Sequence, residues 1–517
     1  MKPLTTSVYT FSDLIEGGYL YVDKTAAIHE LIRGYKGQYF LSRPRRFGKS
    51  LLISTLKAIF QARRELFAGL ALDRSDYDWK PYPVIHLDLG TAAAQTAEEL
   101  EIGLGEYVKE NADAAGIALG NATSSSRFRE LVLKLSAREG KVVILVDEYD
   151  KPLLGHLGEP SAKDIQRVLK SFYGVIKGTE AHQRFVLLTG VSKFSKVSVF
   201  SDLNNLTDLT MDARTATLLG YTQAELEANF PDYIEALAAK LGRTRAETLG
   251  ELREWYNGYR FHPEAEAVYN PVSVMKCFDT REFKNYWFET GTPTFLVDLL
   301  RRAPVRLDDL RVQEPDFSTY DPADLAPLPL LVQTGYLTIA GVEPFGDTRT
   351  YRLAYPNREI AQSFSRWLAI GFSRMPGEDL TAALPRMVAA LEQGRVDEML
   401  ATLQSFFAGV PYDIALANEK YYQTIFFTVF KLLGVAVDAE TRTSAGRIDA
   451  VVKTRTDIFV FEFKLRDTAE AALAQIREKR YFEPFLNDGR RVTLVGVAFD
   501  AATRNLGRWL IEPAPAA

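Results

Sequence analysis

Unbroken apolar runs recur through the first part of the chain, and residues with helical apolar spacing separate them. An apolar run without alternation indicates a strand that is buried on both faces, as in a parallel sheet. The runs predict strands at residues 38–41, 82–89, 141–147, 184–191 and 204–210. The spacing between them predicts helices at residues 51–60 and 97–115, whereas the small polar residues 121–126 predict a loop. This alternation of strands and helices indicates an α/β domain.

The pattern changes twice after this first part. Residues 213–252 have helical apolar spacing throughout. Residues 330–339 and 350–353 predict a helix followed by two strands, with a turn at Gly346 and Asp347, which is the order of a winged-helix module. Such a module binds DNA, or it serves packing or oligomerisation. In the C-terminal part we expect a helix, two strands and a helix, at residues 418–433, 446–452, 458–465 and 469–480.

A phosphate-binding loop is predicted where the first strand ends. Residues 38–50 combine an apolar run, a tight turn and Gly-Lys-Ser at the start of a helical pattern. Backbone N–H groups of such a loop bind phosphate oxygens, and the helix N-terminus adds partial positive charge. We expect Lys49 to contact the β- and γ-phosphates and Ser50 to bind Mg²⁺. The predicted nucleotide-binding residues are Arg45, Arg46, Phe47, Gly48, Lys49, Ser50 and Leu51. Arg43 stands where the usual pattern has Gly, so a basic turn before a core helix is the alternative.

Two carboxylates follow the strand at residues 141–147, where parallel strands carry active-site residues. Asp147 is suited to hold Mg²⁺, and Glu148 is suited to orient or deprotonate an attacking water. The alternative is an acidic helix start after a core strand. Thr189 and Ser192 follow the next strand and are candidates for sensing the γ-phosphate. Capping of a loop by either hydroxyl is the alternative.

The C-terminal hairpin carries charged residues within an apolar strand. Alternation places Glu462 and Lys464 on one face, and pairing of the two strands brings Asp449 close to them. A Glu and a Lys at such positions are costly to bury without a function. Two carboxylates with a main-chain carbonyl form a hard-oxygen site for Mg²⁺ or Mn²⁺. We expect the ion to activate a water, with Lys464 orienting it and offsetting charge on a phosphate.

Composition narrows the class of protein. The 517 residues exceed a single hydrophobic core and suit about two to four domains. One cysteine, Cys277, excludes an internal disulfide, and the five His show no zinc spacing. The net charge of −5 requires any nucleic-acid site to be a local basic patch. Without a signal peptide or an apolar run that could span a bilayer, we expect a cytoplasmic protein with no membrane contact.

Several motifs resemble those of the prokaryotic AAA-ATPase-like family, and the resemblance covers essentially the whole chain. The motifs are residues 21–25, 42–50, 146–153, 188–195, 255–261 and 269–271. The resemblance implies an ATPase of the additional-strand class, with Lys49 and Ser50 in Walker A and Asp147 and Glu148 in Walker B. It implies that Arg43 is a family feature, that a helical lid follows the core, and that the protein forms a homo-oligomer. Arg253 and Arg260 are candidates for the arginine that such lids supply.

The C-terminal part resembles the PD-(D/E)XK nuclease superfamily. Asp449 matches the Asp of that motif, and Glu462-Phe463-Lys464 match (D/E)-X-K. By resemblance Glu419 is the acidic residue of the first helix, and Gln475 is an auxiliary polar residue. The implied metal ligands at this site are Glu419, Asp449 and Glu462. Ile448 replaces the usual Pro, and a fold kept for binding or assembly is the alternative to an active nuclease.

These features predict an α/β chain of four parts. The parts are a P-loop AAA-type ATPase core with a parallel sheet (1–212), a helical lid (213–284), a winged-helix-like connector (285–404) and a restriction-endonuclease-like α/β domain (405–517). We expect ATP hydrolysis coupled to a Mg²⁺- or Mn²⁺-dependent nuclease acting on DNA, in defence or mobile-element biology. The alternative is a nucleotide-switched protein that binds nucleic acid or a partner without cutting.

Overall fold

The protein divides into two compact units, each described separately below. The computed structural model describes residues 1–515 except 93, 158, 194–204, 288–295, 297–298, 301–309, 318–325, 347, 374–376, 409–435, 440–441, 444–445, 448, 465–466, 501 and 504. The first unit comprises Met1–Thr290 and Arg311–Ile360, and the second comprises Gly291–Leu310 and Ala361–Ala517. The finer division into four domains stays a prediction.

A five-stranded parallel sheet lies at the centre of the first unit, in the order β2-β3-β4-β1-β5. Its strands are β1 (Gly37–Ser42), β2 (Val84–Asp88), β3 (Val142–Asp147), β4 (Gln183–Gly190) and β5 (Thr207–Asp208). Every residue of β3 and β4 is buried, which accounts for their unbroken apolar runs. The carboxyl ends of β1, β3 and β4 meet at one edge, so the predicted loop and the two carboxylates are brought together there.

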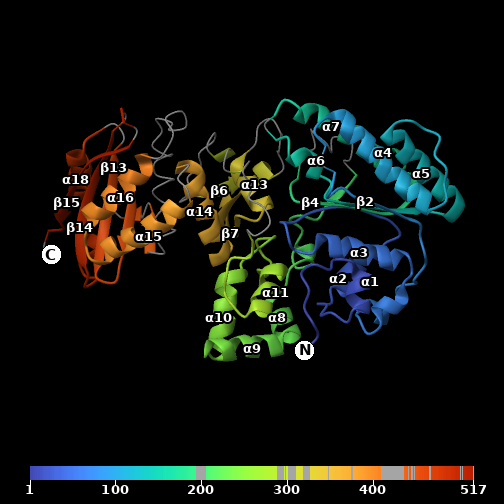
Figure 1. Cartoon of the computed structure of the whole chain (residues 1–517), viewed down its shortest axis with the longest axis horizontal. Helices are drawn as coiled ribbons and strands as arrows, with labels where there is room; N and C mark the ends of the chain where they lie inside the picture. The colour runs from blue at the N-terminus through green and yellow to red at the C-terminus, as the bar shows by residue number, and fades with distance from the viewer. Residues whose placement is uncertain are drawn as a thin grey trace. The chain divides into compact units, whose positions relative to one another are not determined.

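Helices cover both faces of this sheet (Figure 1). On one face lie α1 (Phe11–Glu16), α2 (Thr25–Ile32) and α3 (Lys49–Phe60), and on the other lie α4 (Ala97–Ala114), α5 (Ser124–Glu139), α6 (Lys151–Leu154) and α7 (Ala162–Gly178). The loop predicted at 121–126 is wrong in its second half, because α5 begins at Ser124. The hydroxyl of Thr123 accepts a hydrogen bond from the Ser126 N–H, so these polar residues cap the helix.

Four helices that pack together, a fifth helix and a small sheet follow in the described part of the first unit. The four helices are α8 (Gln223–Asn229), α9 (Pro231–Leu241), α10 (Arg245–Tyr256) and α11 (Pro271–Thr280), which share a hydrophobic core. The small sheet has the order β6-β8-β7, with β6 (Arg311–Gln313), β7 (Thr338–Phe345) and β8 (Thr348–Ala354), and α13 (Pro327–Gln333) precedes β7. The predicted order of helix, strand and strand is therefore present.

A mixed five-stranded sheet forms the second unit, in the order β15-β14-β13-β12-β9. The strands are β9 (Ala436–Ala439), β12 (Ala450–Lys453), β13 (Asp457–Lys464), β14 (Arg491–Asp500) and β15 (Asn505–Pro513), and only β13 and β14 pair in parallel. A short ladder joins β10 (Arg442–Thr443) to β11 (Gly446–Arg447). The helices are α14 (Arg358–Ser373), which begins at the end of the first unit, α15 (Gly377–Glu392), α16 (Val396–Ala408) and α18 (Ala469–Glu478). The predicted helix at 418–433, with Glu419, lies outside the described residues.

Among the described residues, no helix is both long and apolar enough to cross a membrane.

Candidate functional site

The loop after β1 ends at a glycine that starts a helix. Gly48 is the N-cap of α3 and has a φ of +94°, a backbone conformation that an L side chain adopts only with strain. The helix begins at Lys49, so the loop leads directly into a helix N-terminus. This is the strand, loop and helix arrangement that binds phosphate.

Arg43 shows why the first glycine of the usual loop pattern is absent. Its buried guanidinium donates to the carbonyl oxygens of Ser42, Thr210 and Thr215 at 2.8, 2.8 and 3.0 Å. It also lies over the ring of Phe261, 4.1 Å from the centroid. The Arg43 side chain therefore attaches the loop to residues 210–215 and to Phe261.

Phe47 and Arg46 fix the second half of the loop in a similar way. The buried Phe47 ring meets Tyr259, Phe261 and Trp287 edge to face, with centroids 4.8, 5.3 and 6.5 Å away. Arg46 donates from Nη1 to the carbonyl oxygen of Tyr286 at 3.0 Å. Tyr259 and Phe261, from the motif at 255–261, thus pack against the loop through Phe47.

A cavity of about 390 Å³ opens in front of the loop. Its polar end is formed by residues 45–51 together with Glu148. Its walls include apolar side chains from the N-terminal segment, from the residues that precede α8 and from α11, among them Leu20, Val22, Leu219, Tyr221 and Met275. A polar end next to apolar walls suits a ligand that carries phosphates on an apolar ring system.

The Lys49 side chain lies inside the loop. It is buried, and Nζ donates to the carbonyl oxygens of Arg43 and Pro44 at 3.0 and 3.1 Å. Burial lowers the pKa of Lys49, whereas the carboxylates of Asp147, Glu148 and Asp150 raise it. A phosphate would have to replace the loop carbonyls as the partner of this ammonium.

The carboxylates after β3 lie beside the loop but face two cavities. Asp147 is buried, and its Oδ1 accepts from the Thr189 hydroxyl at 2.5 Å and from the Glu148 N–H at 3.0 Å. Asp147 and Ser50 line a second cavity of about 370 Å³, and Ser50 also lines the first. Glu148 has a φ of +50° and lines the first cavity, and burial raises the pKa of its carboxyl.

The hairpin of the second unit brings its charged residues together. Asp449 precedes β12 and accepts from the backbone N–H of Phe463 at 2.8 Å through Oδ2. Lys464 Nζ lies 2.9 Å from Oε1 of the buried Glu462. The register that pairs Ala450 with Phe461 brings Asp449 to this part of β13, whereas Glu462 and Lys464 lie two residues apart on the same strand.

Gln475 of α18 joins the same cluster. Its Nε2 donates to Glu462 Oε1 at 2.5 Å, and its Oε1 accepts from Lys464 Nζ at 2.6 Å. The helix comes this close because Gly496, the partner of Glu462 on β14, has no side chain. A Cβ at Gly496 would lie 2.5 Å from the carbonyl oxygen of Ala469.

Comparisons with known proteins find one family match in the N-terminal part of the chain and another in the C-terminal part. The model of a family described as "Predicted AAA-ATPase" matches residues 5–200, and that of the PD-(D/E)XK nuclease superfamily matches residues 417–509. A protein of Azotobacter chroococcum mcd 1, described as an uncharacterized protein in the vnfD 5′ region, is 39% identical over 530 residues and 99% of each chain. The chain belongs to the same family as that protein: predicted AAA-ATPases with a C-terminal PD-(D/E)XK nuclease superfamily domain.

Two solved structures of Aeropyrum pernix proteins match at low similarity. ORC1 in complex with DNA is 15% identical, with 66% of this chain and 89% of that chain covered and a TM-score of 0.26. ORC2 in ADPNP and ADP complexes is 12% identical, with 67% and 90% covered and a TM-score of 0.29.

In this AAA-ATPase-like chain the structure places the other candidate residues as follows. Ser192 donates from its hydroxyl and its N–H to Asp150 Oδ2, both at 2.7 Å, so Thr189 is the hydroxyl beside Asp147. Arg253 donates from Nε to Gln223 Oε1 at 3.4 Å. Arg260 lines a separate cavity of about 250 Å³. Neither arginine lines the cavity in front of the loop.

The sequence analysis also missed Asp150. Its buried carboxylate accepts three hydrogen bonds from the segment after β4, including one from the Val191 N–H at 3.1 Å. The signal was its place beside Asp147 and Glu148 in the motif at 146–153. This bracing fixes the ends of β3 and β4 relative to each other.

The structure brings together some of the oxygen ligands that a metal ion would need at each site. Among the described residues no group of three or more His, Cys, Asp or Glu is arranged to hold a metal ion. At the hairpin, Asp449 just before β12 and Glu462 on β13 supply two carboxylates, a hard-oxygen set that fits Mg²⁺ or Mn²⁺. Near the loop, Ser50 and Asp147 face one cavity and fit Mg²⁺ in the same way.

Proposed function

We propose that this protein binds and hydrolyses ATP and cuts DNA at a separate metal-dependent site. One observation carries the proposal. The same chain holds a cavity lined by Lys49, Ser50 and Glu148, and a hairpin that gathers Asp449, Glu462 and Lys464. The family matches to an ATPase and to a nuclease superfamily support the two halves.

In the ATPase half, each residue has a separate role. The loop N–H groups and Lys49 bind the phosphates, and the apolar walls near Leu20 and Tyr221 accommodate the base. Ser50 and Asp147 would hold Mg²⁺, which supplies positive charge to the phosphates. Glu148 lines the cavity with a carboxyl of raised pKa, so it is suited to accept a proton from the attacking water.

In the nuclease half, the hairpin supplies the ligands. Asp449 and Glu462, with Glu419 as the acidic residue expected from the first helix of this domain, would hold Mg²⁺ or Mn²⁺. The ion supplies Lewis-acid charge at the scissile phosphate. Lys464, held between Glu462 and Gln475, is placed to offset negative charge that develops on the phosphate.

A second candidate function has an observation in its favour. Glu462 already bonds to Lys464 and Gln475, and the described residues bring only Asp449 to join it. A domain of this kind that binds nucleic acid or a partner under nucleotide control, without cutting, would have the same contacts.

Strand scission by the purified full chain separates the two functions. Linear and circular DNA are incubated with Mn²⁺ or Mg²⁺, with ATP, without it, or with a non-hydrolysable analogue. We expect cleavage by the wild type and none by Asp449→Ala or Lys464→Ala, both of which keep ATPase activity. ATP hydrolysis without cleavage under either metal would reject the nuclease and favour the second function.

A further inference from the structure

The segment at residues 21–25 is a motif of the family with no role in the proposed chemistry. Two of its residues attach it to the core. Asp23 Oδ1 accepts from the N–H and hydroxyl of Thr25 at 2.8 and 2.6 Å, and its Oδ2 accepts from the Ala71 N–H at 2.8 Å. Thr25 Oγ1 accepts from the Leu72 N–H at 3.0 Å. The backbone on either side of Lys24 is thereby fixed.

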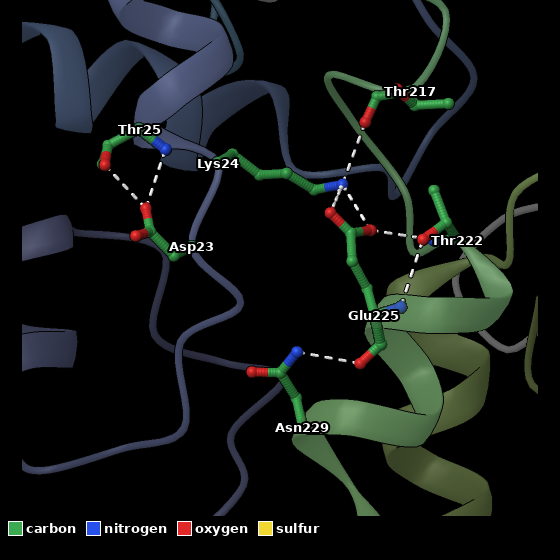
Figure 2. A network of polar contacts seen from close by, with 7 residues as sticks. All are labelled: Asp23, Lys24, Thr25, Thr217, Thr222, Glu225 and Asn229. Carbon is green, nitrogen blue, oxygen red and sulfur yellow. Dashed lines mark hydrogen bonds and ion pairs between the residues drawn. The ribbon is translucent and has the colours of Figure 1, made fainter. Parts of the chain in front are cut away.

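Lys24 extends away from these contacts toward the lid (Figure 2). Its Nζ lies 2.6 Å from both carboxylate oxygens of Glu225, on α8, and donates to the Thr217 carbonyl oxygen at 2.9 Å. Thr217 is followed directly by residues 218–221, which line the cavity in front of the loop, and Lys24 lines it too. One ammonium thus joins the N-terminal segment, the cavity wall and the first lid helix.

We propose that the Lys24–Glu225 ion pair is a clamp that holds α8 and residues 217–221 against the N-terminal segment and so retains the nucleotide in its cavity. Lys24 is a positioning residue in this scheme, and Glu225 is its anchor. The inference rests on the proposed nucleotide binding and assigns a further part of that site.

The burial of the pair makes the loss of one partner more damaging than it would be at a surface contact. The Lys24 side chain is 13% exposed and that of Glu225 is 26% exposed. Removal of one partner of a largely buried pair leaves the other charge without compensation, which is more harmful than removal of both. The clamp therefore predicts strong non-additivity between the two positions.

Glu225 has a second task that makes its position rigid. It forms a capping box with Thr222, in which Glu225 Oε2 accepts from the Thr222 N–H at 2.8 Å and the Thr222 hydroxyl accepts from the Glu225 N–H at 3.1 Å. Gln is also found at this position of capping boxes, so Glu225→Gln removes the charge and can keep the cap.

The lid contains a matched control. Glu247 forms the same capping box with Thr244 at the start of α10, and its side chain is exposed. Glu247→Gln removes one negative charge from an equivalent cap without altering the contacts of Lys24.

The test is the equilibrium Kd and the dissociation rate of a fluorescent ATP analogue. We expect Lys24→Met and Glu225→Gln each to raise Kd about tenfold, mainly through faster dissociation. Lys24→Arg and Glu247→Gln should stay near the wild type. The double variant should bind no more weakly than either single variant. Thermal unfolding of each variant separates loss of binding from loss of folding.

Other results would reject the clamp. If Lys24→Met weakens binding and Glu225→Gln does not, Lys24 contacts the nucleotide directly and the clamp is wrong. If neither changes the dissociation rate in folded protein, the pair has no such role. If the wild type fails to bind the analogue at all, the proposed ATPase function fails and the clamp fails with it.

Discussion

The two candidate sites are built in different ways. The nucleotide site is on a loop whose residues are held by distant segments, as Arg43 is by Thr210 and Thr215. The hairpin site is on strands, where the pairing of Ala450 with Phe461 fixes Asp449 beside Phe463. Backbone register sets the hairpin site, whereas tertiary contacts set the loop.

The difference also shows in the lysines. Lys49 bonds to carbonyl oxygens of its own loop, so a phosphate must exchange for these partners. Lys464 bonds to Glu462 and Gln475, which belong to the hairpin site itself. The loop site is therefore completed by its ligand, and the hairpin site is largely assembled by the fold.

The largest expected effect tests whether the two sites are chemically separate. Glu462→Gln keeps the size of the side chain and removes a carboxylate from the hairpin. We expect DNA cleavage to fall by more than about 10³-fold, because a proposed metal ligand is lost, with ATP hydrolysis unchanged. Asp457→Asn is the control, since it removes a buried carboxylate at the other end of the same strand. Equal loss in the two variants would mean that damage to the fold, and not to the site, stops cleavage.

The next effect concerns the loop site alone. Glu148→Gln should lower ATP hydrolysis by roughly 10²- to 10³-fold, because the proposed general base is lost, and leave ATP affinity close to that of the wild type. Steady-state hydrolysis and equilibrium binding are measured together. The control is Glu139→Gln, at the exposed end of α5. Retained hydrolysis in Glu148→Gln would remove Glu148 from the proposed chemistry.

The contrast explains which features the sequence predicts. Glu462 and Lys464 follow from alternation along one strand, and the hairpin brings Asp449 to them. The contacts of Arg43 and the hydrogen bonds between Asp150 and Ser192 join segments far apart in sequence, so a local pattern can point to a residue such as Asp150 but not to its partner. A helix N-cap at Thr123 is compatible with the sequence, but a cluster of small polar residues is equally typical of a loop. Cofactor-contacting roles for all these residues stay predictions.

We expect a buried acid near the loop, Glu359, to make the stability of the first unit depend on pH. Glu359 Oε1 accepts from the N–H groups of Tyr286 and Trp287 at 2.6 and 2.8 Å, next to the partners of Arg46 and Phe47. Burial raises the pKa of Glu359 to about 7 from 4.5. Below pH 4.5 the carboxyl is protonated in both folded and unfolded chains, and its contribution to stability is fully present. That contribution is lost as pH rises through about 7, on the order of 3 kcal/mol.

Glu359→Gln tests this dependence because the amide does not titrate. Between pH 5 and pH 8 we expect the urea midpoint of the wild type to fall more than that of the variant. Glu282→Gln, an exposed carboxylate that pairs with Lys284, is the control and should behave as the wild type does. Parallel pH profiles for the wild type and Glu359→Gln would contradict the prediction.

The smallest expected effect measures how far strand register alone assembles the hairpin site. Gln475→Ala removes the helix-borne contact to Glu462 and Lys464 and leaves both strands intact. We expect the cleavage rate to fall about tenfold and the Mn²⁺ concentration needed for half-maximal cleavage to rise. The effect is moderate because residues that orient metal ligands contribute less to metal binding than the ligands themselves. Gln404→Ala is the matched control, since it removes a glutamine that donates to the Leu506 carbonyl oxygen within the same unit. If Gln475→Ala cuts and binds Mn²⁺ as the wild type does, the hairpin alone sets the geometry. A loss as large as that of Glu462→Gln would instead make the hairpin site as dependent on tertiary support as the loop.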